Sequence, residues 1–132
     1  MKFLHVAILL GILSGCASSG DAYSSRWAQL SAEHRRLVAT AEGSAWQQAF
    51  LPVHNAFWRD VYSSCIGKAK NSGVAYFRAL AVIDETGTVT EVLAKPNSNH
   101  FSCFSKQMVG RKYPAPPVAP FYEVFLIMLE PK

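Results

Sequence analysis

The chain has few of the residues that define several common classes of small protein. It contains three Cys among 132 residues, too few for a disulfide-framework toxin or growth factor. Charged residues make up 17% of the sequence, and the net charge of +4 is spread without any Lys/Arg-rich run, so we expect no nucleic-acid partner. With 50% hydrophobic residues, the chain is too apolar for a disordered segment, and its length suits one globular domain.

The sequence also lacks the spacings of common catalytic and metal sites. It has no HExxH, CxxC, GxSxG or Gly-rich phosphate loop, and the carboxylates Asp84 and Glu85 fall in a turn rather than in a catalytic pair. Three isolated histidines follow the first fifteen residues: His34, His54 and His100. A predicted helix separates His54 from Cys65 by about 16 Å, too far for a nucleophile and its base. We therefore expect no enzyme activity, no metal site and no cofactor.

The first fifteen residues have the pattern of a secretion signal. Lys2 supplies a positive charge, and residues 3–13 are apolar except for His5 and Gly11. Eleven residues would form a helix of about 16 Å, too short for a hydrocarbon core of about 30 Å. The segment is therefore predicted as a cleaved signal peptide rather than a membrane span.

The end of this signal, Leu13-Ser14-Gly15-Cys16, resembles the lipobox of bacterial lipoprotein precursors. The resemblance implies cleavage before Cys16, a diacylglyceryl thioether on its sulfur and acylation of the new amino terminus; two or three acyl chains anchor a protein stably. Ala17, in place of Asp, resembles the signal for sorting to the outer membrane. We predict a lipid-anchored outer-membrane protein that faces the periplasm. The alternative is an ordinary signal peptide, cut near Gly15 or Ala17, with a chance cysteine.

The remaining sequence changes from helical to strand periodicity near residue 74. Residues 16–25 are predicted as the lipidated cysteine and a flexible tether. The later elements are helices over residues 24–42 and from Pro52 to about residue 71, strands over 74–84 and 88–95 around a turn at 84–87, a short helix over 101–109 and a last strand over 121–130. The first helix is expected to break at Gly43 and Ser44. This order predicts an α+β fold: a three-stranded antiparallel sheet with helices on one face.

Cys65 and Cys103 remain once Cys16 is assigned to the lipid. They lie 38 residues apart and would be in an oxidising compartment, where disulfides form. A catalytic or metal-binding pair is the alternative, but no CxxC motif supports it. We therefore favour a structural disulfide, which would stabilise the fold by about 4 kcal/mol in the chain-entropy model.

Several of these features, taken in order, resemble the TonB C-terminal-like domains. They are a helix ending near Cys65, the strand and turn Val82-Ile83-Asp84-Glu85-Thr86-Gly87-Thr88-Val89, Cys103 in a short helix, the segment Tyr113-Pro114-Ala115-Pro116-Pro117 and an apolar last strand. The likeness covers roughly residues 53–129 and is greatest to the cysteine-paired branch called AgmX/PglI C-terminal. It implies the order αββαβ over residues 52–132, preceded by a helical cap over 26–51, and the binding of a partner strand along the sheet edge. It implies no catalytic residue.

The segment that leads into the last strand supplies the candidate contact residues. Extended Pro-rich backbone flanked by aromatic residues can form a docking strip, here with Tyr113, Pro114, Phe121 and Tyr122. A rigid crossover into the strand is the alternative interpretation. The binding element itself is expected at a free sheet edge, near residues 88–95 or residues 121–130.

These expectations combine into one hypothesis and one alternative. The hypothesis is a non-catalytic, lipid-anchored periplasmic module that recognises another envelope protein or peptide through a sheet edge, with the membrane as its second partner. The alternative is a periplasmic inhibitor or immunity lipoprotein that neutralises a cell-wall hydrolase or a secreted effector. An inhibitor of that kind would present a loop rather than an edge strand.

Overall fold

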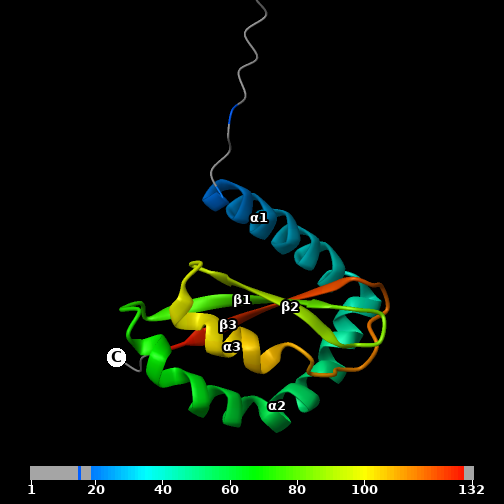
Figure 1. The fold of residues 1–132 in the computed structure, drawn as a ribbon. Helices are drawn as coiled ribbons and strands as arrows, with labels where there is room; N and C mark the ends of the chain where they lie inside the picture. The colour runs from blue at the N-terminus through cyan, green and yellow to red at the C-terminus, as the bar shows by residue number, and fades with distance from the viewer. Residues whose placement is uncertain (1–14, 16–18, 130–132) are drawn as a thin grey trace, which may run out of the picture.

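The structure is a computed structural model that describes residue 15 and residues 19–129. These residues form, in order, α1 (Ser19–Val38), α2 (Ala41–Lys70), β1 (Tyr76–Ile83), β2 (Val89–Lys95), the 3-10 helix η1 (Asn99–Phe101), α3 (Ser102–Met108) and β3 (Phe121–Met128). The strands make one antiparallel sheet with the order β2-β1-β3 (Figure 1). The predicted α+β fold with a three-stranded antiparallel sheet is therefore confirmed.

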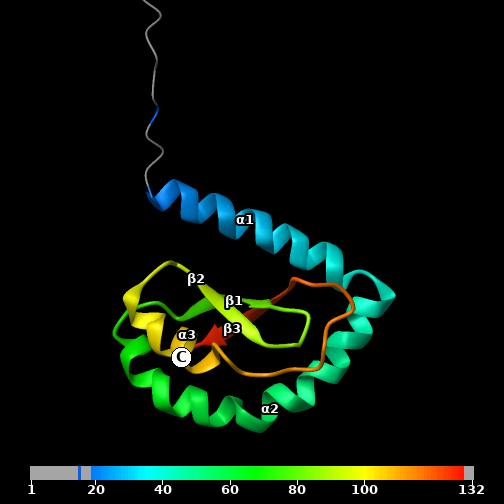
Figure 2. The same cartoon turned by 45° about the vertical axis from the view of Figure 1, so that its right-hand side comes forward.

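Helices cover both faces of this sheet because its central strand, β1, is apolar on both sides. Phe77 and the other odd-numbered residues of β1 belong to the core under α2 and α3. Leu80 is fully buried on the opposite face, where it packs against Trp27 of α1. Figure 2 shows α1 above the sheet and α2 below it. The predicted placement on one face holds for α2 and α3, whereas the added N-terminal helix covers the second face.

The first two helices are separated at residues 39 and 40, not at Gly43 and Ser44 as predicted. Thr40 has extended backbone (φ −77°, ψ 154°), and its Oγ1 accepts a hydrogen bond from the N–H of Gly43 at 3.0 Å, which caps α2. Gly43 lies inside the first turn of α2, where a Cβ would come within 2.0 Å of the carbonyl oxygen of Leu37. This glycine therefore permits close helix packing instead of ending a helix.

α2 runs unbroken through Pro52, so the prediction of a new helix at this proline is wrong. A proline inside a helix removes one backbone hydrogen bond and favours a break. Trp46 before it and Val61 after it are both buried against the sheet, and packing on both sides holds the two halves as one helix. The boundary expected between a cap (26–51) and a sheet domain (52–132) falls within this helix.

α1 begins at Ser19, so most of the tether expected over residues 16–25 is helical. Tyr23 attaches this end of α1 to the edge of the sheet. Its hydroxyl donates to the carbonyl oxygen of Ala94 at 2.7 Å and accepts from the N–H of the same residue at 2.8 Å. One turn further along, Trp27 is buried, and together these contacts order a segment whose small polar residues suggested flexibility.

The hairpin between β1 and β2 turns at residues 84–87, as predicted. Oδ1 of Asp84 accepts hydrogen bonds from the N–H groups of Thr86 and Thr88, at 2.9 Å and 3.0 Å. Gly87 has a φ of +87°, and a Cβ there would lie 2.1 Å from the carbonyl oxygen of Tyr113. Both the left-handed backbone and this close approach require glycine. The turn is thereby fixed against the segment that leads into β3.

Candidate functional site

Cys16, the predicted lipidation site, lies outside the described residues, and the lipid anchor stays a prediction. Within the part of the chain that the structure describes, no helix combines the length and the apolar character needed to cross a membrane.

The predicted disulfide between Cys65 and Cys103 is present and joins α2 to α3, with 5.4 Å between the two Cα atoms. Cys65 is fully buried and belongs to the core cluster that includes Phe77 and Phe104. These surroundings are apolar, as expected for a structural disulfide rather than a reactive pair. The bond holds the short helix α3 against the long helix α2.

Two of the four predicted contact residues, Tyr113 and Phe121, are buried and therefore cannot meet a partner at the surface. Tyr113 is 3% exposed and Phe121 is 0% exposed, and the ring of Phe121 lies 4.5 Å from that of Trp46. The carbonyl oxygen of Pro114 accepts a hydrogen bond from the indole N–H of Trp46 at 2.8 Å, and Tyr122 is partly buried. Tyr113 and Phe121 are therefore corrected from contact residues to core residues, while Pro114 and Tyr122 keep part of their surface.

The histidines are dispersed over the described chain. His54 lies in the core, where its ring stacks 5.0 Å from that of Phe125, and burial lowers its pKa to about 4. His34 donates from Nδ1 to the carbonyl oxygen of Tyr122 at 2.7 Å, while His100 lies within η1. Among the described residues, no three His, Cys, Asp or Glu side chains are grouped as metal ligands.

The two outer strands of the sheet differ in how the backbone groups on their outward edges are hydrogen-bonded. In β2, these groups are bonded near both ends of the strand. Tyr23 bonds both outward backbone groups of Ala94. At the other end, the N–H of Val89 donates to the carbonyl oxygen of Arg111 at 2.9 Å, and its own carbonyl oxygen accepts from the N–H of Gly110 at 2.8 Å. A strand from another molecule would have to displace these contacts.

The free edge of β3 is formed by its even-numbered residues. Leu129, just after the strand, donates its N–H to the carbonyl oxygen of Ala75, just before β1, at 2.8 Å. In an antiparallel pair, residues alternate between bonding the partner strand and pointing away from it. Odd-numbered residues of β3 therefore bond to β1, and even-numbered residues direct both N–H and C=O outward.

Side chains bond the outward carbonyls at the two ends of β3. His34 donates to Tyr122 at one end, and the hydroxyl of Tyr62 donates to the carbonyl oxygen of Met128 at 2.8 Å at the other. Between these ends lie Val124 and Leu126, whose outward backbone groups make no hydrogen bond to any side chain or loop of the described residues. This stretch of β3 is the open edge of the sheet.

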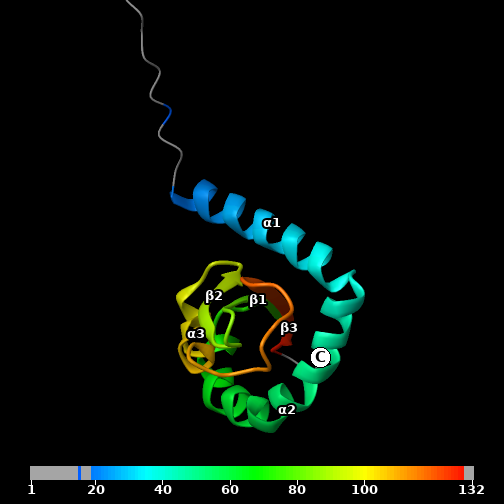
Figure 3. The ribbon, with the colours of Figure 1, turned by 90° about the vertical axis from the view of Figure 1, so that its right-hand side faces the viewer.

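A groove of about 580 Å³ runs beside the open edge. Its walls are residues 123–128 of β3 and six side chains of α2: Phe50, Leu51, His54, Trp58, Arg59 and Tyr62. Figure 3 shows α2 curving around the side of the sheet on which β3 lies. Leu51 on the helix is 52% exposed and Leu126 on the strand is 60% exposed, so the groove presents large apolar side chains to solvent.

Glu123 introduces a buried carboxyl group at one end of this groove. It is 6% exposed, and Gln47 donates from Nε2 to its two carboxyl oxygens at 3.0 Å and 3.2 Å. Burial raises the pKa of Glu123 to about 7, although the hydrogen bond from Gln47 acts in the opposite direction. Nδ1 of His34 lies 3.9 Å from its Oε2. The carboxyl group therefore titrates near neutral pH.

The sequence contained a signal for only part of this site. An acidic residue inside the apolar run FYEVFLIMLE, at an inward position of the strand alternation, could have marked Glu123 as buried. No signal marked Leu51 or Trp58 of α2 as groove residues, because they meet β3 only in the folded chain. An edge with unbonded N–H and C=O groups beside an apolar groove is suited to pairing with an added strand.

Comparisons of the chain with protein-family models, curated proteins and solved structures gave no match.

Proposed function

We propose that the protein is a non-catalytic binding module that takes an extended peptide, or an edge segment of another envelope protein, along the open edge of β3. The observation that carries the proposal is the pair of residues Val124 and Leu126, whose outward backbone groups are unbonded within the described chain. Unpaired edge groups are a template for strand addition. The main-chain hydrogen bonds would supply affinity, and the neighbouring groove would supply selectivity.

The difference between the two edges supports β3 over β2 as the binding element. β2 is bonded by Tyr23 at Ala94 and by the 110–111 segment at Val89. On its outward edge, β3 is bonded by the described residues at its first and last carbonyls, and the open stretch is the middle of the strand. An added strand would place every second side chain over the groove, where Leu51 and Trp58 favour apolar residues.

The test substitutes proline for Leu126. Because the N–H of this residue points away from β1, proline at this position removes a donor of the open edge without removing a bond of the sheet. A photo-reactive amino acid at Leu51, across the groove, would report the partner in intact envelopes. We expect a cross-linked adduct in the parent chain and in the control Leu126→Val, and loss of that adduct in Leu126→Pro.

Further positions distinguish the alternatives in the same experiment. Thr90 lies on the edge of β2, and Glu85 lies in the exposed hairpin turn. Cross-links from Thr90, or an adduct at Leu51 that persists in Leu126→Pro, would contradict the proposal. Cross-links from Glu85 alone would favour an inhibitor that presents a loop. Equal melting temperatures of the two Leu126 variants would exclude unfolding as the reason for a lost adduct.

We also propose, from the resemblance to a lipobox, that the module is anchored in the outer membrane through Cys16 and faces the periplasm. Replacement of Cys16 by Ala is then expected to leave an unprocessed precursor, because the lipid is attached to that sulfur before cleavage. Electrophoretic mobility and fractionation of envelopes measure the effect, with Ser14→Ala as the control. A Cys16→Ala chain that is processed and fractionated like the parent would contradict the anchor.

A further inference from the structure

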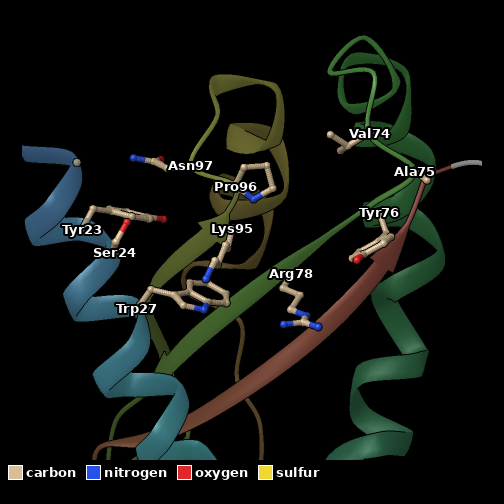
Figure 4. Close-up of a pocket in the computed structure, with 11 residues that line it drawn as sticks. Tyr23, Ser24, Trp27, Val74, Ala75, Tyr76, Arg78, Lys95, Pro96 and Asn97 are labelled. Carbon is tan, nitrogen blue, oxygen red and sulfur yellow. The ribbon is translucent and has the colours of Figure 1, made fainter.

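A cleft of about 810 Å³ lies on the other face of the sheet, between the first half of α1 and the ends of β1 and β2 (Figure 4). Tyr23 and Trp27 of α1 form one wall, Val74 precedes β1, Tyr76 begins that strand, and Pro96 follows β2. The volume is in the range of small-molecule sites, which are lined mainly by apolar and aromatic side chains with a few polar groups. No part of the proposed strand-binding groove belongs to it.

The charged groups that line this cleft are two cations that lie directly opposite each other. Arg78 of β1 pairs with Lys95 of β2 in the sheet register, and both side chains extend into the cleft (Figure 4). Like charges at directly opposed positions destabilise an antiparallel pair. Among the described residues, neither side chain has an ion-pair partner and no Asp or Glu lines the cleft. An anion bound between them would relieve this repulsion.

A second hollow extends the same cationic surface along α1. It has a volume of about 460 Å³, shares Arg78 and Lys95 with the first, and adds Arg35 from α1. Within the described part of the chain, this hollow also has no acidic lining residue. Three cations thus face the space between α1 and the sheet, and the charge favours an anionic occupant.

Exposed apolar side chains adjoin the two cations. Tyr76 pairs with Met128 in the register of β1 and β3, and the two are 50% and 52% exposed. They lie two residues from Arg78 and from Leu126 respectively, and therefore on the same face of the sheet. A plain inorganic anion would neutralise the cations but leave this apolar surface uncovered. A ligand with an anionic head and an apolar body would match both.

We propose that the cleft binds an anionic amphiphile, specifically a phospholipid whose phosphate lies between Arg78 and Lys95 and whose acyl chain lies across Tyr76 and Met128. α1 begins three residues after Cys16, so an anchor at that cysteine would bring the cleft close to a bilayer. Met128 also lines the strand-binding groove, but Arg78, Lys95 and Tyr76 line the cleft and not that groove. The binding itself therefore requires neither this anchor nor strand addition at β3.

The test titrates the full chain, purified in a non-ionic detergent, with three probes followed by NMR of the backbone amides. The probes are dihexanoyl-phosphatidylglycerol below its micelle-forming concentration, dihexanoyl-phosphatidylcholine, and glycerophosphoglycerol, which is the first probe without its acyl chains. We expect saturable shifts at residues 76–78 and 95–97 with phosphatidylglycerol, and affinities at least about tenfold weaker for the other two.

Charge variants locate the site. The double variant Arg78→Gln/Lys95→Gln is expected to lose about tenfold or more in phosphatidylglycerol affinity. The control Lys106→Gln/Lys112→Gln removes two exposed cations elsewhere and should bind like the parent. The Arg78/Lys95 variant should melt at the same temperature as the parent or higher, because like-charge repulsion is removed, and this separates lost binding from lost folding.

Three results would overturn the proposal. Equal affinity for glycerophosphoglycerol would reduce the cleft to an oxyanion site without a role for the acyl chain. Equal affinity for phosphatidylcholine would remove the requirement for net negative charge. Unchanged phosphatidylglycerol binding by Arg78→Gln/Lys95→Gln would place the lipid elsewhere on the protein.

Discussion

Replacing both Cys65 and Cys103 by alanine is expected to lower the free energy of unfolding by about 4 kcal/mol. The disulfide closes a loop of 38 residues that contains β1, β2 and the turn between them, and its loss frees that loop in the unfolded chain. Domains of this size are stable by about 5–15 kcal/mol in total. The substitution would therefore remove a large share of the stability of the protein.

The effect should be concentrated at α3. This helix has seven residues, too few to be stable alone, and without the disulfide it is held mainly by buried side chains such as Phe104 and Met108. Hydrogen exchange of its amides should accelerate more than that of the centre of α2.

Urea unfolding of the double variant and of the reduced parent chain measures the loss. The reduced parent is the matched control, because it lacks the bond but keeps both sulfur atoms in the core. If oxidised parent, reduced parent and variant all unfold at the same urea concentration, the disulfide contributes nothing and the expectation is wrong.

Glu123→Gln and His54→Phe are expected to change the pH dependence of stability in opposite directions. Burial raises the pKa of Glu123 to about 7, whereas the unfolded carboxyl titrates near 4.5. Between these values the folded chain keeps a proton that the unfolded chain has lost, so this group destabilises the fold as the pH rises. Burial lowers the pKa of His54 to about 4, below its unfolded value near 6.5. Here the unfolded chain holds the extra proton, and stability is lost as the pH falls.

The two effects oppose each other in the parent chain between about pH 4.5 and pH 6.5. Glu123→Gln removes the loss toward high pH, and its stability relative to the parent should rise by up to about 1.4 kcal/mol per pH unit, or about 3 kcal/mol over the whole window. His54→Phe removes the loss of stability toward low pH. Its stability relative to the parent should therefore fall as the pH rises, at a similar rate. The lost contact between His54 and the hydroxyl of Tyr113, 2.9 Å apart, adds an offset.

Urea unfolding at several pH values from 4.5 to 7 measures both differences. His34, whose pKa burial also lowers, is present in the parent and in both variants. The contribution of His34 to the pH dependence of stability therefore cancels when each variant is compared with the parent. If the stability of both variants relative to the parent changed with pH in the same direction, or did not change with pH, Glu123 and His54 would not titrate as their burial implies.

Local patterns predicted the strands because their physical causes are local. In β1, odd-numbered residues such as Phe77 and Ile83 alternate with residues that face the other side of the sheet. This alternation places the odd-numbered side chains under α2. The turn at residues 84–87 was predicted from Gly87 and from Asp84, whose short side chain accepts a hydrogen bond from a backbone N–H group within the turn. The cysteine pairing needed only an even pair in an oxidising setting, and the structure contains it.

Helix boundaries were predicted less well because packing overrode local preferences. Pro52 is a local signal for a helix start, yet buried side chains on both sides of it keep α2 continuous. The Pro-rich segment favoured a surface position for Tyr113 and Phe121, but both rings are buried in the core, where they contact Trp46. In each case the deciding contacts join α2 to the sheet or to the segment before β3, which are separate elements of the chain.

Local sequence patterns and composition are sufficient to predict the α+β class, the order of strands along the chain, the hairpin turn and the cysteine pair. Which edge of the sheet is open follows from the packing of segments that are distant in the sequence. α1 crosses the sheet and bonds the edge of β2 through Tyr23. On the outward edge of β3, His34 and Tyr62 bond the two ends, and no described residue bonds the centre. The same position of α1 over the sheet forms the cleft around Arg78 and Lys95. Such sites arise from hydrogen bonds and charges between distant segments, and no periodicity of a single segment encodes them.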